Sequence, residues 1–174
     1  PDNVEEFSDG IEPVSQLPYF TRLAQKFISA MTAPTGQGTL YQVDLRLRPS
    51  GNAGPIVSSM RSFIDYYRSM AWTWEHMVLT RARVITAEKH FLKTIEQNIK
   101  RLLTQKRDHR KLLLDVAEMR SRIERNKKPA GLWDVKHARG GLIDIEFITQ
   151  YLQLKYAHSN TEVLATNTRA AIIR

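Results

Sequence analysis

The most regular pattern of apolar and polar residues runs from Tyr41 to Arg48, where the two kinds alternate strictly. An alternation with a period of two predicts a half-buried β-strand, because successive side chains of a strand point to opposite faces. The polar face of this strand carries Gln42, Asp44, Arg46 and Arg48. Since a lone strand leaves its backbone groups unpaired, we expect its partner strands to lie outside this chain.

Helical spacing of apolar residues dominates the rest of the chain. It predicts helices over residues 15–31, 58–67, 74–85, 87–103, 108–126 and 142–157. The expected N-caps are Ser15 for the first helix, Ser58 or Ser59 for the second and Asp108 for the fifth. We therefore predict a mainly α protein with a small α/β remnant, divided into residues 1–57 and residues 58–174.

The predicted strand leads into a turn, Pro49–Pro55, whose glycines can adopt positive φ and bring backbone amides close to an anion. Asp44 is the best candidate for a metal ligand, and Arg46 and Arg48 are suited to phosphate oxygens. This combination is typical of phosphoryl or nucleotidyl transfer. A two-metal site needs more than one carboxylate. Either the companions of Asp44 are missing, or the face is solvated and carries a local Asp–Arg ion pair.

A second acidic pair, Asp144 and Glu146, follows two glycines. On a strand these carboxylates would share one face and bind metals together, whereas on a helix they lie about 200° apart. The long apolar continuation of the segment favours a helix, so we expect no metal site there. A buried helix would need a cation for each carboxylate. The candidates are Arg81, Arg83 and Lys136.

The segment Trp72–His76 has the Glu-His spelling of a zinc protease, but Thr80 stands where the second histidine would be needed. Zinc is therefore not expected. Glu75 and Arg83 lie two turns apart on the predicted third helix. We interpret them as structural anchors, with a substrate-facing Arg83 as the alternative.

Charge is distributed unevenly along the chain, which carries a formal net charge of +8. The first twelve residues contain five acidic and no basic residues, and basic residues are densest over 100–111 and 120–128. Such clusters indicate either an anionic partner or solvated helix faces. The aromatic residues fall at core spacing, so we do not expect nucleic-acid binding. No apolar run is long enough for a membrane span, and the lack of cysteine fits a cytoplasmic location.

Three long segments occur in one order: LYQVDLRLRPSGNAGPIVSSMRSFIDYY, AWTWEHMVLTRARVI and KHARGGLIDIEFITQYLQLKYAH. Together they resemble the glutamate–ammonia-ligase adenylyltransferase family of bifunctional bacterial enzymes. The resemblance covers residues 19–174, and it is stronger to the C-terminal, adenylylating half of those enzymes. It implies the end of a polymerase-β-like nucleotidyltransferase domain followed by a helical-bundle domain.

The resemblance also implies roles for individual residues. In that family a Gly-Ser-x-x-Asp-x-Asp motif supplies two metal carboxylates, and the Asp of V-D-x-R-L-R-P supplies a third. Asp44 matches the third, while the first motif is expected upstream of this chain, which would make the chain an inactive fragment. The resemblance gives no role to Arg46 and Arg48; because they lie on the same face of the predicted strand as Asp44, we expect them to neutralise the triphosphate or orient Asp44. The turn residues that would approach the nucleotide or the substrate are Ser50, Gly51 and Gly54.

The implied reaction is transfer of AMP from ATP, with Mg²⁺, to a tyrosine hydroxyl of glutamine synthetase. The implied partners are glutamine synthetase, the PII signalling protein and ATP, without nucleic acid or membrane. The alternative is a non-catalytic helical module that docks on glutamine synthetase or PII.

Overall fold

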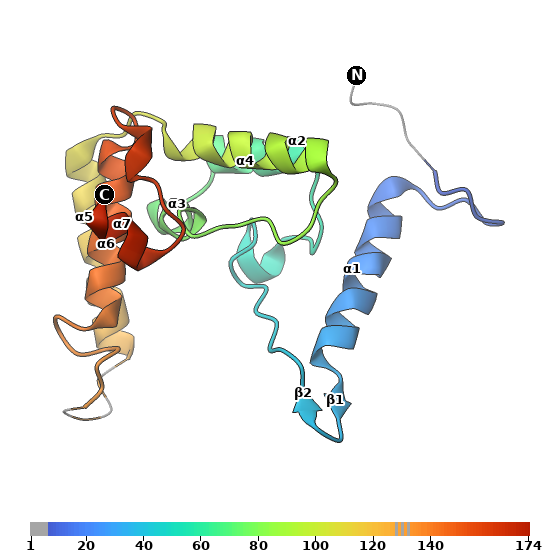
Figure 1. Cartoon of the computed structure of the whole chain (residues 1–174), viewed down its shortest axis with the longest axis horizontal. Helices are drawn as coiled ribbons and strands as arrows, with labels where there is room; N and C mark the ends of the chain where they lie inside the picture. The colour runs from blue at the N-terminus through green and yellow to red at the C-terminus, as the bar shows by residue number, and fades with distance from the viewer. Residues whose placement is uncertain (1–6, 128, 130, 132) are drawn as a thin grey trace. The chain divides into compact units, whose positions relative to one another are not determined.

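The computed structural model describes residues 7–127, 129, 131 and 133–174, and it is mainly helical (Figure 1). The chain divides into two compact units, Pro1–Phe63 and Ile64–Arg174. No helix in the described part is both long and apolar enough to cross a membrane. The mainly α prediction is therefore confirmed, whereas the division at residue 57 into parts of two domains stays a prediction.

The first unit contains helix α1, Gln16–Thr32, which confirms the helix predicted over 15–31. Ser15 occupies the N-cap position, although its side chain makes no capping hydrogen bond. A hairpin of two short strands follows, β1 (Pro34–Thr35) and β2 (Gly38–Thr39). None of the residues described between 7 and 63 is buried.

The predicted strand over residues 41–48 is wrong. This segment forms no ladder with any described residue, and six of its eight residues are exposed instead of alternating between buried and exposed. The backbone turns at its end, where the Arg48 amide donates to the Leu45 carbonyl at 3.4 Å. A strand is stabilised by its neighbours in a sheet, and the described residues offer this segment none.

The second unit is built around helices α3 (Thr73–Leu79) and α6 (Leu142–Tyr156). Helix α3 packs against α4 (Lys89–Leu103), α5 (His109–Asn126) and α6, while α6 also packs against α5 and α7 (Thr168–Ile173) (Figure 1). Helix α2, Met60–Ser69, spans the boundary between the units. Two short 3₁₀ turns complete the elements, η1 at Gly51–Ala53 and η2 at Thr161–Val163.

The core of the second unit is apolar, and its buried members are Tyr67, Met77, Leu79, Leu102, Leu103, Leu112, Val116, Leu154 and Ala157. Leu112 and Val116 come from the stripe that the spacing in the fifth predicted helix indicates. Two predicted N-caps are confirmed, because Asp108 accepts from the Lys111 amide at 2.9 Å and Ser59 accepts from the Ser62 amide at 3.1 Å.

The third predicted helix, 74–85, is too long, since α3 ends at Leu79. Beyond it the Thr80 hydroxyl donates to the Met77 carbonyl at 2.7 Å, and the amides of Arg81 and Ala82 make bonds to carbonyls three residues back. These tighter bonds end the α-helical ladder. Glu75 and Arg83 are consequently not on one helix, and the side chain of Arg83 is exposed.

Candidate functional site

Asp44 and Arg46 form an ion pair on the exposed segment after the hairpin. The Arg46 Nη2 donates to Asp44 Oδ2 at 2.7 Å, and Nε lies 3.0 Å from Oδ1. The Arg46 backbone amide also donates to Asp44 Oδ1 at 3.0 Å. These hydrogen bonds from Arg46 hold the pKa of the Asp44 carboxyl at about 2, well below its usual range. Asp44 is therefore a carboxylate at every physiological pH, with both oxygens engaged by one arginine.

Arg48 makes a different set of contacts, all of them with backbone carbonyls of its own loop. Its Nη1 donates to the Leu45 carbonyl at 2.6 Å, and its Nε and Nη2 donate to the Gly54 carbonyl at 3.2 and 3.1 Å. The guanidinium thereby joins the two ends of the turn. We expected the side chains of Asp44, Arg46 and Arg48 to share one face of a strand. Only Asp44 and Arg46 contact each other, whereas Arg48 contacts backbone carbonyls.

The turn between those ends is tightly wound. Ser50 has a φ of 60°, and a Cβ on Gly54 would lie 2.1 Å from the Pro49 carbonyl oxygen. The Gly51 and Gly54 amides donate to the carbonyls of Arg48 and Gly51, at 2.8 and 3.2 Å. The glycines thus allow the tight turn, and their amides donate hydrogen bonds within the loop. Ser50 is exposed, with a hydroxyl that makes no hydrogen bond to any other described residue.

These residues alone do not fit a magnesium site. Within the described part of the chain, no three carboxylate or histidine side chains are grouped so that they could hold a metal ion. Asp44 is a single carboxylate, and a two-metal centre for phosphoryl transfer requires several. The described part of the chain therefore does not form such a centre by itself.

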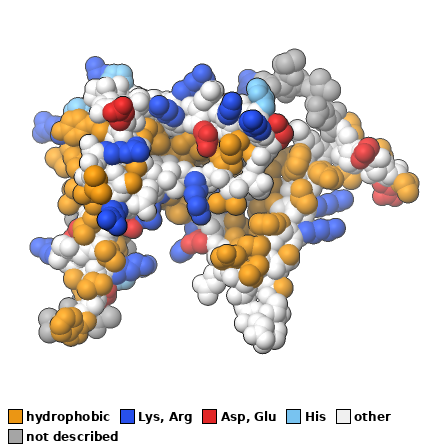
Figure 2. Space-filling view, viewed as in Figure 1, with side chains coloured by type: hydrophobic (Ala, Val, Ile, Leu, Met, Phe, Trp, Pro, Cys, Tyr) orange, Lys and Arg blue, Asp and Glu red, His pale blue; other side chains and the backbone are white. Residues whose placement is uncertain are grey.

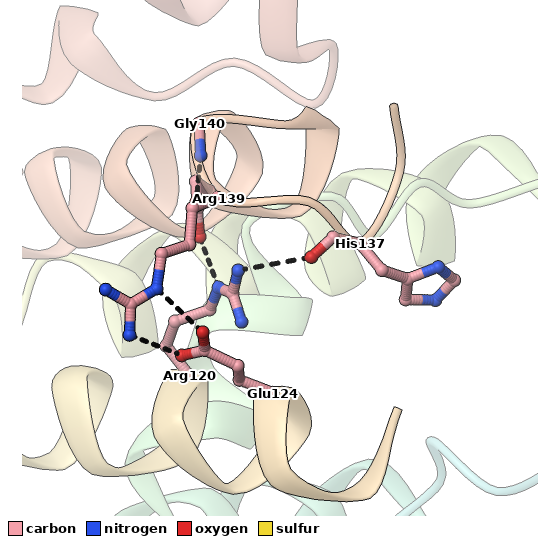
Figure 3. A network of polar contacts seen from close by, with 6 residues as sticks. Arg120, Glu124, His137, Arg139 and Gly140 are labelled. Carbon is pink, nitrogen blue, oxygen red and sulfur yellow. Dashed lines mark hydrogen bonds and ion pairs between the residues drawn. The ribbon is translucent and has the colours of Figure 1, made fainter. Parts of the chain in front are cut away.

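The second group of charged residues joins α5 to the start of α6 (Figure 3). Arg120 Nε donates to Asp144 Oδ1, and Arg120 Nη2 lies 3.5 Å from the His137 carbonyl. The other Asp144 oxygen accepts from the Gly140 amide at 2.6 Å. The hydrogen bond from Arg120 lowers the pKa of Asp144 and raises that of Arg120. Asp144 thus fixes the beginning of α6 to the side of α5.

The two glycines that precede α6 are required by its entry turn. Gly140 has a φ of +78°, and a Cβ on Gly141 would lie 2.4 Å from the Val135 carbonyl oxygen and 2.8 Å from that of Ala138. A side chain at either position would strain the backbone or collide with it. Arg139 next to them donates to Glu124 of α5 at 2.7 Å. The Gly-Gly-x-x-Asp motif is therefore explained by helix docking.

The helix at 142–156 confirms that Asp144 and Glu146 do not form a strand-borne metal pair. Glu146 pairs with Arg81 at 2.7 Å, one of the three cations expected for this acidic pair. The partner of Asp144, Arg120, was not among them. Arg120 lies 24 residues earlier in the chain and carries no local spacing signal, so only the packing of α5 on α6 identifies it.

Glu75 is a structural anchor, as expected. Its side chain is buried, and it accepts from the Tyr66 hydroxyl at 2.7 Å and from the Trp72 amide at 2.8 Å. The Nδ1 of the neighbouring His76 lies 3.2 Å from Arg107 Nη2. Burial, together with the charge of Arg107, lowers the pKa of His76 to about 4.

Comparison with protein families assigns the chain to one of them. Residues 2–98 match the model of the glutamate-ammonia ligase adenylyltransferase family, which is more than half of the chain. The chain belongs to this family. The resemblance inferred from the three sequence segments is thereby confirmed.

Curated relatives of this adenylyltransferase family match the chain almost from end to end. The bifunctional glutamine synthetase adenylyltransferase/adenylyl-removing enzyme of Rhodopseudomonas palustris strain BisB5 is 48% identical over 171 residues, which are 98% of the chain. The proteins of the same name from Bradyrhizobium diazoefficiens and Rhizobium meliloti strain 1021 are 49% and 50% identical over 92% and 84% of it. The chain spans only 17%, 16% and 15% of the lengths of these three relatives.

The match to the adenylyltransferase family model includes the loop of Asp44, Arg46 and Arg48 as well as Glu75. The Arg120–Asp144 pair lies beyond residue 98, in the part of the chain that the 171-residue alignment with the Rhodopseudomonas enzyme also covers. Both groups of charged residues therefore lie within sequence that the chain shares with adenylyltransferases.

Proposed function

We propose that this chain is part of an enzyme that transfers AMP from ATP to a tyrosine of glutamine synthetase, and that Asp44 belongs to the reaction centre. The observation that carries this is an exposed, permanently ionised carboxylate beside a tightly wound loop, in a chain of the adenylyltransferase family. The names of the relatives, which join glutamine synthetase with adenylyl transfer and removal, support the substrate and the reaction class.

In this proposal each loop residue has its own role. Arg46 holds Asp44 in one orientation and releases it when a cation replaces the guanidinium. Arg46 is then free to face the phosphates of ATP, for which a guanidinium is suited. Arg48 is a positioning residue, because its contacts keep Leu45 and Gly54 together. Ser50, Gly51 and Gly54 form the surface that approaches the nucleotide.

Magnesium would be held by Asp44 together with carboxylates that this chain does not provide. When bound, the ion supplies charge neutralisation of the triphosphate. We therefore propose that residues 1–57 are the end of a polymerase-β-like nucleotidyltransferase domain, that 58–174 belong to a helical-bundle domain, and that the chain alone does not transfer AMP. The proposed location is the cytoplasm, where ATP and metabolic enzymes meet.

The test is intact-mass analysis of glutamine synthetase after incubation with MgATP, glutamine and either this chain or the Rhodopseudomonas relative. We expect an added AMP only with the relative. Addition by this chain would refute the missing-carboxylate proposal and would direct attention to Asp144 and Glu146. In the relative, replacing the Asp of its V-D-x-R-L-R-P motif by Asn should abolish transfer with little change in thermal midpoint. A folded and fully active variant would refute the role given to Asp44.

A second candidate function is docking without chemistry. It is favoured by the second unit, which has an apolar core of its own and ion pairs between its helices. In this reading, residues 64–174 recognise glutamine synthetase or the PII signalling protein. Binding of either protein by this chain, together with no AMP transfer by the Rhodopseudomonas relative, would support it.

A further inference from the structure

The basic residues over 100–111 gather where α4 ends and α5 begins. We call Lys100, Arg101, Lys106, Arg110 and Lys111 the basic corner, and all five are exposed. Figure 1 shows α4 and α5 meeting at an angle, and Figure 2 shows Lys and Arg side chains along the upper edge of the molecule, over α4 and this corner. The corner lies wholly within the second unit.

The basic corner differs from the second basic run in what its cations contact. In the run that begins at 120, Arg120 pairs with Asp144 and Arg122 pairs with Glu118. In the corner, only Lys111 has an acidic neighbour among the described residues, Asp115 at 3.7 Å. The other four cations have no carboxylate partner in the described part of the chain. Arg120 of the second run is thus used within the fold, whereas the charge of the corner is directed to solvent.

The position of these charges works against the stability of α5. Arg110 and Lys111 stand in its first turn, at the end where the helix dipole is positive and where acidic residues are favoured. Lys100 and Arg101, by contrast, stand in the last turn of α4, where cations are favourable. An approaching anionic surface would offset both the repulsion among the corner residues and their conflict with the dipole of α5.

The surroundings of the basic corner favour a protein partner over nucleic acid. Leu113 and Leu114, two and three residues after Lys111, keep 51% and 60% of their surface exposed. Apolar side chains beside arginines are typical of protein interfaces. The sequence contains no Phe, Tyr or Trp between residues 92 and 132, so the corner segment offers no aromatic platform on which bases could stack.

We propose that the basic corner, with Leu113 and Leu114, is a docking surface for an acidic patch on a protein. Resting on the proposed function, we take this protein to be the substrate, glutamine synthetase. The corner thereby supplies recognition of the whole substrate protein at a distance in sequence from Asp44. Such charged docking increases the rate of encounter and depends steeply on salt.

The experiment measures binding of this chain to immobilised glutamine synthetase at about 50 mM and about 300 mM NaCl. The test variant combines Lys100→Gln, Arg101→Gln, Lys106→Gln and Arg110→Gln. The control variant combines Arg22→Gln, Lys26→Gln, Arg61→Gln and Arg68→Gln, four exposed cations outside the corner, and it changes the net charge by the same amount. Circular dichroism establishes that both variants keep the helical content of the parent chain.

We expect the corner variant to bind about tenfold more weakly than the parent chain at low salt, while the control stays within about threefold, and we expect the difference to shrink at high salt. Equal weakening of both variants, or no binding of the parent chain, would overturn the proposal. Tighter binding of a single-stranded oligonucleotide, lost in the corner variant, would also overturn it.

The outcome is separable from that of the proposed function. If the relative transfers AMP but the corner variant binds as tightly as the parent chain, the docking proposal is refuted and the proposed reaction is supported. If binding depends on the corner but the relative transfers no AMP, the corner is a protein-docking surface and the proposed AMP transfer is refuted.

Discussion

Arg120 of α5 donates to Asp144 in the first turn of α6, so one charge pair attaches the start of the last long helix to its neighbour. The side chains of Arg120 and Asp144 are only 15% and 21% exposed. The pair has little water around it and cannot readily exchange its partner for solvent. Asp144 also accepts from the Gly140 amide at 2.6 Å, so it connects the turn before α6 to Arg120; Figure 3 shows this turn beside Arg120.

Replacing Arg120 by Ala should destabilise the second unit by about 2 kcal/mol, because Asp144 would keep its charge in a half-buried place without its guanidinium. Urea unfolding followed by circular dichroism measures this change. The matched control is Arg122→Ala on the same helix, whose pair with Glu118 is 61% and 67% exposed. That change should cost less than about 0.5 kcal/mol. Equal effects of the two variants would show that the Arg120–Asp144 pair contributes no more than a surface pair.

Gly141→Ala should destabilise the unit by about 1–3 kcal/mol, because the added Cβ would overlap the Val135 and Ala138 carbonyl oxygens. Thermal unfolding would show a lower midpoint. Gly131→Ala is the control, since a Cβ there meets nothing within 4 Å and its φ is not positive. An unchanged midpoint in Gly141→Ala would mean that the entry turn to α6 relaxes without cost.

The stability of the second unit should decrease as the pH falls from about 6.5 to about 4. His76 titrates near pH 6.5 in an unfolded chain, whereas its pKa in the folded chain is lowered to about 4. Between these values the unfolded state binds more protons, so the contribution of His76 is fully present above pH 6.5 and is lost on acidification. The loss should reach about 3 kcal/mol.

His76→Gln is the comparison for this pH effect, because glutamine keeps a neutral hydrogen-bond acceptor within reach of Arg107. Urea unfolding at several pH values should give the variant a flatter dependence between pH 6.5 and 4 than the parent chain has. Identical slopes would show that His76 does not carry the effect. The carboxylates are the same in both proteins, so the comparison isolates the contribution of His76.

Arg46→Ala should return the pKa of Asp44 from about 2 towards its ordinary value of 3.8, because hydrogen bonds from Arg46 are the main cause of the shift. Carbon-13 NMR of the labelled Asp44 carboxyl group follows the titration directly. Arg48→Ala serves as the control, since Arg48 bonds to the carbonyls of Leu45 and Gly54 and not to Asp44. A pKa that stays near 2 without Arg46 would contradict the pairing.

Local sequence patterns predicted five of the described helices well, because the apolar periodicity of a helix is a local property, whereas α3 was predicted too long and α7 was not predicted. Asp108 and Ser59 could be named as caps from the residues alone, and α1 and α6 agree with their predicted ranges within about two residues. The strand at 41–48 failed for the opposite reason. Its alternation describes a face that a sheet would cover, and pairing with a sheet is not a local property.

The candidate site shows the same division between local and distant interactions. Asp44 and Arg46 are two positions apart, and their contact was anticipated as a local ion pair. Arg48 could not be assigned from its place in the alternation, because the carbonyls that it contacts are brought together only when the turn closes. Arg120 was missed because its partner is 24 residues away and depends on how two helices pack.

The absence of any buried residue among those described from 7 to 63 has a calorimetric consequence. The increase in heat capacity on unfolding grows with the apolar surface that becomes exposed. Among the described residues, all the fully buried side chains lie within residues 64–174. A melting curve of the whole chain should therefore report mainly on the second unit. The enthalpy of its transition should be that expected for about 110 residues, not for the full length.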